Sequence, residues 1–125
     1  MEVLVDSSVW IDYFRSGKRT TRVDQLLDEN LVVTNDLVLA ELVPYLMLKN
    51  QTRVIALLRE IRRLPMAIDW DAVIGMQVQC LRKGNNGIGI PDLLIAQNAK
   101  ANGCAIYTLD KHFNLLASVV NISLY

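Results

Sequence analysis

Apolar residues occur along this chain in two patterns, short continuous runs and helical repeats. Val3–Val5 and Leu31–Val33 are runs of β-branched and aliphatic residues, which predict short buried strands. Between Thr52 and Leu64 the apolar residues recur three and four positions apart. This spacing predicts an amphipathic helix, which Pro65 should end.

Cap-forming residues indicate where helices begin and end. Asp6-Ser7-Ser8 and Thr34-Asn35-Asp36 each follow a predicted strand and precede an apolar stretch, so each should start a helix, with Ser7 and Ser8 capping the first. Asp69 should cap another helix. The other expected elements are helices over 23–28, 92–102 (with Pro91 at its start and Gly103 at its end) and 110–117, and strands over 66–68, 104–109 and 119–125.

Strands and helices therefore alternate along the whole chain. This order is typical of the α/β class, with a short, mostly parallel central sheet flanked by helices on both faces. No repeat, linker or change in composition marks a second domain. With 125 residues, of which 52% are hydrophobic, the sequence predicts a single domain over residues 1–125.

The longest apolar stretch, Leu37–Leu48, is interrupted only by the charge of Glu41. It falls short of the roughly 20 residues that a membrane span requires, so we expect none. A helix that is apolar nearly all round has more apolar surface than one buried face needs. We therefore expect a second protein chain to cover part of it.

Charge and cysteine usage narrow the function classes. Thirteen basic and thirteen acidic residues cancel, which argues against nucleic-acid binding through overall charge. Cys80 and Cys104 do not form a zinc-binding pair and are expected to be reduced, buried thiols of a cytoplasmic protein. The start, Met1–Asp6, lacks the positive charge of an export signal. Basic residues gather only locally, either as nucleic-acid contacts or as solvated surface, at Arg15, Lys18, Arg19 and Arg22 and at Arg59, Arg62 and Arg63.

Four carboxylates are placed where they can meet. Asp6 and Asp110 directly follow predicted strands, Asp92 lies in the first turn of a helix, and Glu41 lies about one and a half turns into another. In open parallel sheets, ligands bind beyond the carboxyl ends of the strands, so these side chains should converge there. Each aspartate taken singly is equally explained as a helix cap.

The chemistry of these residues favours a hard divalent cation. Glu41 has apolar neighbours on every side, and a partly buried carboxylate needs a cation or a hydrogen-bond donor. Lysine and arginine are scarce around the four acids, apart from Lys111. Oxygen ligands with little local positive charge favour Mg²⁺ or Mn²⁺. Zinc is disfavoured because His112, the only histidine, is typical of an ordinary helix residue.

Four short motifs contain the four acids and follow one another along the chain: Val5-Asp6-Ser7-Ser8-Val9, Leu39-Ala40-Glu41-Leu42, Pro91-Asp92-Leu93-Leu94-Ile95-Ala96 and Thr108-Leu109-Asp110-Lys111-His112-Phe113. In this order and at these separations they resemble the PIN-domain ribonucleases, and among them the VapC-type toxins of toxin–antitoxin pairs. The similarity covers essentially the whole chain.

The resemblance implies a three-layer α/β/α PIN-like domain that hydrolyses RNA phosphodiester bonds with Mg²⁺ or Mn²⁺. It implies a cognate antitoxin and a homodimer as partners, and Thr108 as a hydroxyl that orients a metal-bound water. The family often has a glycine shortly after the glutamate, whereas here Pro44 follows Glu41, and we expect Pro44 to kink the helix. The resemblance makes Asp6, Glu41, Asp92 and Asp110 the metal-binding acids.

Other functions stay open. A housekeeping RNA-processing nuclease would carry the same acids. A receiver-like Mg²⁺-binding signalling domain would have two adjacent acids after the first strand, and a haloacid-dehalogenase-like phosphatase would have an aspartate at the position of Ser8. A non-catalytic binding module has no reason to hold all four acids.

Overall fold

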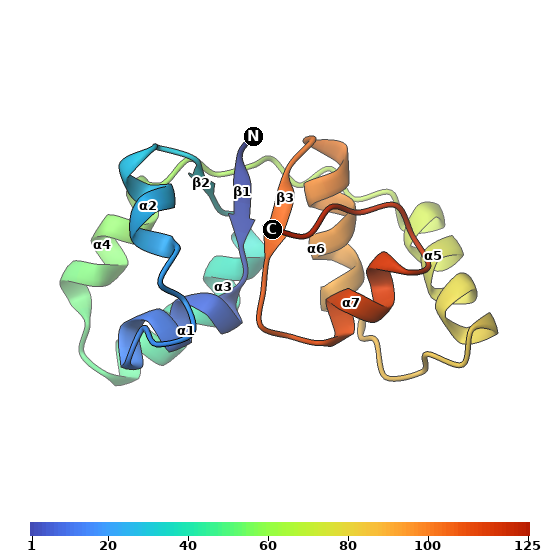
Figure 1. Ribbon diagram of the computed structural model, residues 1–125, viewed down its shortest axis with the longest axis horizontal. Helices are drawn as coiled ribbons and strands as arrows, with labels where there is room; N and C mark the ends of the chain where they lie inside the picture. The colour runs from blue at the N-terminus through green and yellow to red at the C-terminus, as the bar shows by residue number, and fades with distance from the viewer.

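A three-stranded parallel sheet lies at the centre of the computed structural model, which describes residues 1–125 (Figure 1). The strands are β1 (Val3–Val5), β2 (Val32–Val33) and β3 (Ala105–Tyr107), in the order β2-β1-β3. The chain leaves β1 toward β2 on one side and later returns to β3 on the other. The carboxyl end of β1 is therefore the point where the strand order reverses, the usual ligand site of such sheets.

Seven helices cover the sheet on both faces, which confirms the predicted α/β/α architecture (Figure 1). Every residue of the three strands is buried, as expected for parallel strands covered from two sides. No helix has both the length and the apolar character needed to cross a membrane. The helices are α1 (Ser7–Arg15), α2 (Val23–Asp28), α3 (Asp36–Leu48), α4 (Thr52–Glu60), α5 (Trp70–Arg82), α6 (Ile90–Ala101) and α7 (His112–Ala117).

The helix predicted over 52–64 ends earlier than its periodicity suggests. Helix α4 stops at Glu60, and the following residues run beside the end of β2. There the Thr34 amide donates to the Arg62 carbonyl at 3.0 Å, and the Leu64 amide donates to the Thr34 carbonyl at 2.8 Å. Thr34 is buried, so its backbone N–H and C=O groups need hydrogen-bond partners, and the residues after α4 supply them. The local spacing of apolar residues does not reveal this pairing.

Two of the predicted strands, over 66–68 and 119–125, were wrong. Residues 66–68 form no strand, and the segment 119–125 contributes only one parallel bridge, between Leu124 and Ile106. The sheet therefore has fewer strands than the apolar runs suggested. Within 119–125, Val120 is the one residue that is buried.

Helix α3 continues through Pro44 without a break from Asp36 to Leu48. It begins where the sequence predicted, because the Asn35 side chain accepts a hydrogen bond from the Val38 amide at 2.8 Å. Its apolar composition does not bury it all round. Ala40, Pro44, Met47 and Leu48 are exposed, so part of the apolar surface of this helix faces solvent.

A buried pair of amide side chains ties α3 to α6. Asn35 and Asn98 are 0% and 5% exposed. The Nδ2 atom of Asn35 donates to Oδ1 of Asn98 at 2.8 Å, and Nδ2 of Asn98 donates to the Pro65 carbonyl at 2.8 Å. Because buried polar groups need partners, this chain of bonds fixes the two helices relative to each other.

We expect Asn98→Leu to lower the free energy of unfolding by about 2 kcal/mol or more, because it leaves the Asn35 amide and the Pro65 carbonyl buried without partners. Urea titration measures the change. Lys100→Ala, at an exposed position of the same helix, serves as control and should change stability by less than about 0.5 kcal/mol. Equal stability of the two variants would contradict the structural role of the amide pair.

Candidate active site

The four predicted acids lie around the carboxyl end of the sheet. The Asp6 amide donates to the Tyr107 carbonyl at 2.9 Å, so Asp6 sits where β1 and β3 end side by side. Asp110 follows β3 by three residues, and Asp92 is the third residue of α6. Glu41 projects from α3, and its pKa responds to Asp6, Asp92 and Asp110. The structure thus brings together acids from four separate segments.

Asp6 occupies the N-cap position of α1, yet its side chain makes no capping hydrogen bond. The carboxylate is 5% exposed and accepts two hydroxyl bonds at Oδ2, from Ser8 at 2.7 Å and from Thr108 at 3.0 Å. The simple explanation of Asp6 as a helix cap therefore fails.

Ser8 was expected to cap α1, and the structure corrects this. Its Oγ atom donates to Asp6 and accepts a hydrogen bond from the Leu109 amide at 3.1 Å. Ser8 thus connects the end of β1 with the segment after β3. The sequence signal was its position two residues after Asp6, which equally fits a cap.

Thr108 also holds acids in place. Its Oγ1 atom donates to Asp6 and accepts a hydrogen bond from the Asp110 amide at 3.0 Å. A hydroxyl has one hydrogen to donate, and here that hydrogen goes to a carboxylate. The predicted alignment of a water by Thr108 stays a prediction.

His112 is the residue that sequence reasoning undervalued. Its Nδ1 atom lies 3.5 Å from Oδ2 of Asp92 and 3.6 Å from Oδ1 of Asp110. The His112 amide also donates to Oδ1 of Asp110 at 2.9 Å. One donor atom of each of these three residues falls within 4.8 Å of the others.

Burial and mutual repulsion make two of these acids harder to ionise. The pKa of Glu41 is raised, first because neighbouring atoms exclude water from part of the side chain and then because Asp6 and Asp92 repel a further negative charge, while a Ser7 hydrogen bond opposes the change. Glu41 remains exposed to solvent as a residue, while part of its side chain is shielded from water.

The pKa of Asp92 is raised by the same two causes, burial first and then the charge of Asp110. A hydrogen bond from the Gly89 backbone and the proximity of His112 partly offset this rise. The four carboxylates therefore interact electrostatically, and ionising them together lowers the free energy of unfolding of the metal-free protein.

No lysine or arginine forms an ion pair with these four acids. Arg62 and Arg63, from the second basic group, instead pair with Glu2 at 2.8 Å and Asp36 at 3.1 Å. The acidic cluster therefore has no lysine or arginine to balance its charge.

The donor set fits a divalent cation. The ligand atoms that lie within 4.8 Å of one another belong to two carboxylates and one imidazole, those of Asp92, Asp110 and His112. Because carboxylate oxygens predominate among these donors, the set suits Mg²⁺ or Mn²⁺ better than zinc.

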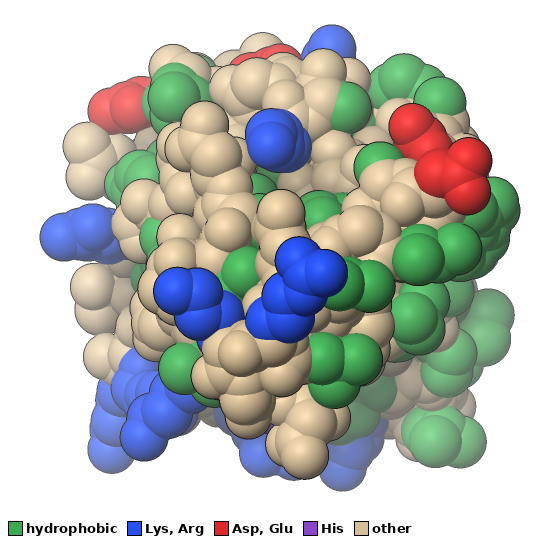
Figure 2. All heavy atoms as spheres, turned by 90° about the vertical axis from the view of Figure 1, so that its right-hand side faces the viewer, with side chains coloured by type: hydrophobic (Ala, Val, Ile, Leu, Met, Phe, Trp, Pro, Cys, Tyr) green, Lys and Arg blue, Asp and Glu red, His purple; other side chains and the backbone are tan.

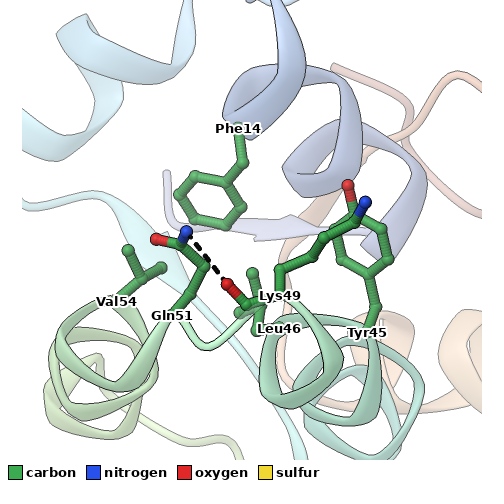
Figure 3. Close-up of a pocket in the computed structure, with 6 residues that line it drawn as sticks. All are labelled: Phe14, Tyr45, Leu46, Lys49, Gln51 and Val54. Atoms are coloured by element: carbon green, nitrogen blue, oxygen red, sulfur yellow. Dashed lines mark hydrogen bonds between the residues drawn. The ribbon is translucent and has the colours of Figure 1, made fainter.

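A second concave feature lies away from the acids, between α1, α2 and α4. It is a hollow of about 430 Å³ whose lining is entirely apolar. A neighbouring hollow of about 290 Å³ shares Phe14 and Val54 with it and opens beside Tyr45 and Lys49, as Figure 3 shows. We call the two together the apolar groove. Its wall residues are Trp10, Tyr13, Phe14, Leu27, Val54, Leu57, Leu58 and Ile61, with Tyr45, Leu46, Lys49 and Gln51 at the second hollow.

Solved structures with a similar fold come from toxin–antitoxin complexes and a toxin. The chain is similar to VapBC2 from Rickettsia felis bound to a DNA fragment from its promoter, with a TM-score of 0.77 and 20% identity over 100% of this chain and 98% of that chain. It is also similar to DNA-bound VapBC from Salmonella typhimurium (TM-score 0.76, 16% identity, 100% and 97% covered). Mycobacterium tuberculosis VapC20, a Sarcin-Ricin loop cleaving toxin, gives a TM-score of 0.61 at 16% identity with 97% and 98% covered.

No curated protein matches the sequence. The PIN domain family, by contrast, matches residues 3–119, which is nearly the whole chain. That match joins all four acid-bearing segments, from Asp6 to Asp110, in one family pattern. The chain therefore belongs to the PIN domain family.

Proposed function

We propose that this protein is a metal-dependent endoribonuclease and the toxin of a type II toxin–antitoxin pair. The observation that carries the proposal is the cluster of four carboxylates, uncompensated by lysine or arginine, at the point where the strand order reverses. Membership of the PIN domain family supports nuclease chemistry. The similarity to VapBC structures supports the toxin role over a housekeeping RNA-processing role.

Asp6, Glu41, Asp92 and Asp110 would hold the cation, Mg²⁺ or Mn²⁺, with His112 beside two of them. When bound, such an ion lowers the pKa of a water and stabilises negative charge on phosphoryl oxygens. The chain's own residues supply the rest. Ser8 and Thr108 orient Asp6. Glu41 and Asp92 have raised pKa values, so either holds a proton more readily than a free carboxyl and is suited to proton exchange.

A receiver-like signalling function is not supported. Membership of the PIN domain family argues against it, and Ser7 and Ser8 follow Asp6 where a receiver would have a second acid. A non-catalytic binding module would gain nothing from the unfavourable charge cluster.

Two surfaces support protein partners. The apolar groove has the shape and lining that an amphipathic helix of another chain requires, and we propose that the cognate antitoxin binds there. The exposed apolar side of α3, which includes Met47 at 58% and Leu48 at 84% exposure, suits a second chain, including a second copy in a homodimer. The free, buried thiols of Cys80 and Cys104 agree with a cytoplasmic location, which we also propose.

Purified protein, separated from any antitoxin, should cleave RNA within accessible single-stranded loops. EDTA should stop the reaction because the acids alone lack the cation, and added Mg²⁺ or Mn²⁺ should restore it. Gel analysis of labelled RNA, with identification of the product ends, measures the cleavage. Full activity in EDTA would contradict the proposed function.

Asp92→Asn should lower the cleavage rate by about 100-fold or more. A change to a residue that only supports a metal ligand typically lowers activity by about 10- to 100-fold. Its metal-free fold should be as stable as the parent or more stable, because one repelling charge is removed. Millimolar Mg²⁺ should raise the melting temperature of the parent but raise that of the variant much less.

The matched control for this experiment is Asp28→Asn, an exposed aspartate on α2 outside the cluster. It should keep both the cleavage rate and the response to Mg²⁺. If Asp92→Asn responded to Mg²⁺ as the parent does, Asp92 would be structural and the proposed cation site would be misplaced.

The raised pKa of Glu41 predicts a pH-dependent stability difference in EDTA. A carboxyl whose pKa is higher in the folded state stabilises the fold when protonated, and this contribution is lost as pH rises through the folded-state pKa. Glu41→Gln should therefore melt at a higher temperature than the parent at about pH 7, and this advantage should shrink toward about pH 4. Glu60→Gln controls for loss of an exposed charge. A difference between Glu41→Gln and the parent that is constant across this range would contradict the repulsion.

A further inference from the structure

His112 presents one of its ring nitrogens to two of the acids. The Nδ1 atom lies 3.5 Å from Oδ2 of Asp92 and 3.6 Å from Oδ1 of Asp110. Both separations are longer than the usual N–H···O hydrogen bond of about 2.9 Å. Hydrogen bonding therefore does not explain why the ring faces these oxygens. One ligand atom from each of the three residues lies within 4.8 Å of the others, so a single cation can contact all three.

The backbone holds the His112 ring in this position. The His112 amide donates to Oδ1 of Asp110 at 2.9 Å, which fixes the turn between the two residues. Phe113, the next residue of α7, is fully buried and anchors the start of that helix. The second ring nitrogen, Nε2, lies on the side of Gly87, where an added Cβ atom would be 3.6 Å away. Nδ1 is therefore the nitrogen that is directed at the acids.

The three side chains are only partly buried. Those of Asp92, Asp110 and His112 are 20%, 38% and 43% exposed. The imidazole thus has room to turn toward solvent, yet its nitrogen is directed at the carboxylate oxygens. An ion held between these side chains keeps access to water, which Mg²⁺ and similar ions retain as part of their ligand set.

An imidazole nitrogen distinguishes Mn²⁺ from Mg²⁺. Mg²⁺ is bound in proteins through oxygen, from carboxylates, phosphates and water. Mn²⁺ also binds carboxylate oxygens, but as a transition-metal ion it accepts nitrogen ligands as well. A site made of carboxylates alone therefore binds both ions, whereas a nitrogen among the ligands favours Mn²⁺.

We propose that His112 binds the cation of this site directly through Nδ1 and gives the site a preference for Mn²⁺ over Mg²⁺. The proposal rests on the metal-dependent nuclease function proposed above and deepens it, because it names the ion and a ligand besides the four acids. Asp92 and Asp110 share the ion with His112, while Asp6 and Glu41 complete the acidic surroundings.

The chain offers no other imidazole, since His112 is the one histidine among its 125 residues. Carboxylates occur elsewhere on the surface without one. Figure 2, which shows the face over α5, has acidic side chains near its upper right with no histidine beside them. Mn²⁺ held weakly by such carboxylates would have oxygen ligands alone. A signal from a histidine nitrogen on Mn²⁺ therefore reports the site at the end of the sheet.

Because there is one histidine, labelling histidine with ¹⁵N marks a single residue. Untagged, metal-free protein is loaded with substoichiometric Mn²⁺, and pulsed electron paramagnetic resonance (EPR) measures which nitrogen nuclei couple to the ion. Metal ligands bind in their deprotonated form, so the measurement is made at about pH 8. We expect a directly bound nitrogen whose coupling changes from the ¹⁴N to the ¹⁵N pattern when histidine alone is labelled. Bound Mn²⁺ without this coupling would overturn the proposal.

His112→Asn separates the preference for Mn²⁺ from cation binding itself, because asparagine can place an amide oxygen near the position of Nδ1. The affinity for Mn²⁺, measured from the EPR signal of the free ion, should fall by about tenfold or more, since residues that only support a metal ligand typically cost about 10- to 100-fold. The affinity for Mg²⁺, measured by its competition with Mn²⁺, should change by less than about threefold. Asn114→Ala, at an exposed position of the same helix, is the control and should bind both ions as the parent does.

The outcomes separate this proposal from the nuclease function. Equal losses of affinity for the two ions in His112→Asn would overturn the preference for Mn²⁺ and leave metal-dependent cleavage of RNA intact. Full cleavage in EDTA would contradict the nuclease proposal and leave the coupling of Mn²⁺ to the His112 nitrogen unaffected. The labelling experiment uses the parent protein, so it decides whether His112 is a ligand even if His112→Asn fails to fold.

Discussion

Repulsion among the carboxylates at the carboxyl end of the sheet is the constraint on which the rest of this structure depends. Asp6, Glu41, Asp92 and Asp110 come from four segments, and no lysine or arginine pairs with them. A fold that holds such a group must recover the lost free energy elsewhere. The fully buried strands and the large buried side chains around them supply that compensation.

The acids of the site differ in burial and in hydrogen bonding. Asp6 is buried and receives two hydroxyl bonds from Ser8 and Thr108, which satisfy a charge that water cannot reach. Glu41 keeps contact with solvent and has a raised pKa, so it is the more adaptable member. A site that combines a buried, hydrogen-bonded carboxylate with a solvent-facing carboxylate of raised pKa can hold a cation in a defined place and still accept a proton.

The sequence predicted the fold class and the meeting of the four acids because both follow from local signals. A strand followed by a cap-forming aspartate places that residue at the sheet edge, and the parallel order brings such edges together. The number of strands was overestimated, since an apolar run near the C-terminus looks like a strand whether or not a neighbour pairs with it. Only the bridge between Leu124 and Ile106 forms there.

Side-chain roles were less predictable than positions. Ser8 has the sequence context of a cap, yet its hydroxyl contacts the nearby Asp6 and the amide of Leu109, which lies in the segment after β3. His112 looked ordinary because its closeness to Asp92 depends on how α6 and α7 are placed. The contacts of Ser8 with Leu109 and of Asp92 with His112 join residues 101 and 20 positions apart, so no local pattern contains them.

The exposed apolar surfaces lie on helices that are connected to the site. Helix α3 carries Glu41 and is tied to α6 through Asn35 and Asn98, while α5 packs against α6 and holds the Ile88 carbonyl through Gln77. Helix α6 thus receives support from both neighbours. Each neighbour also has apolar side chains facing water, a surface whose burial against another chain is favourable. A partner that covered α3 or α5 would therefore stabilise the same arrangement that carboxylate repulsion destabilises, so we expect assembly to affect site geometry through α6.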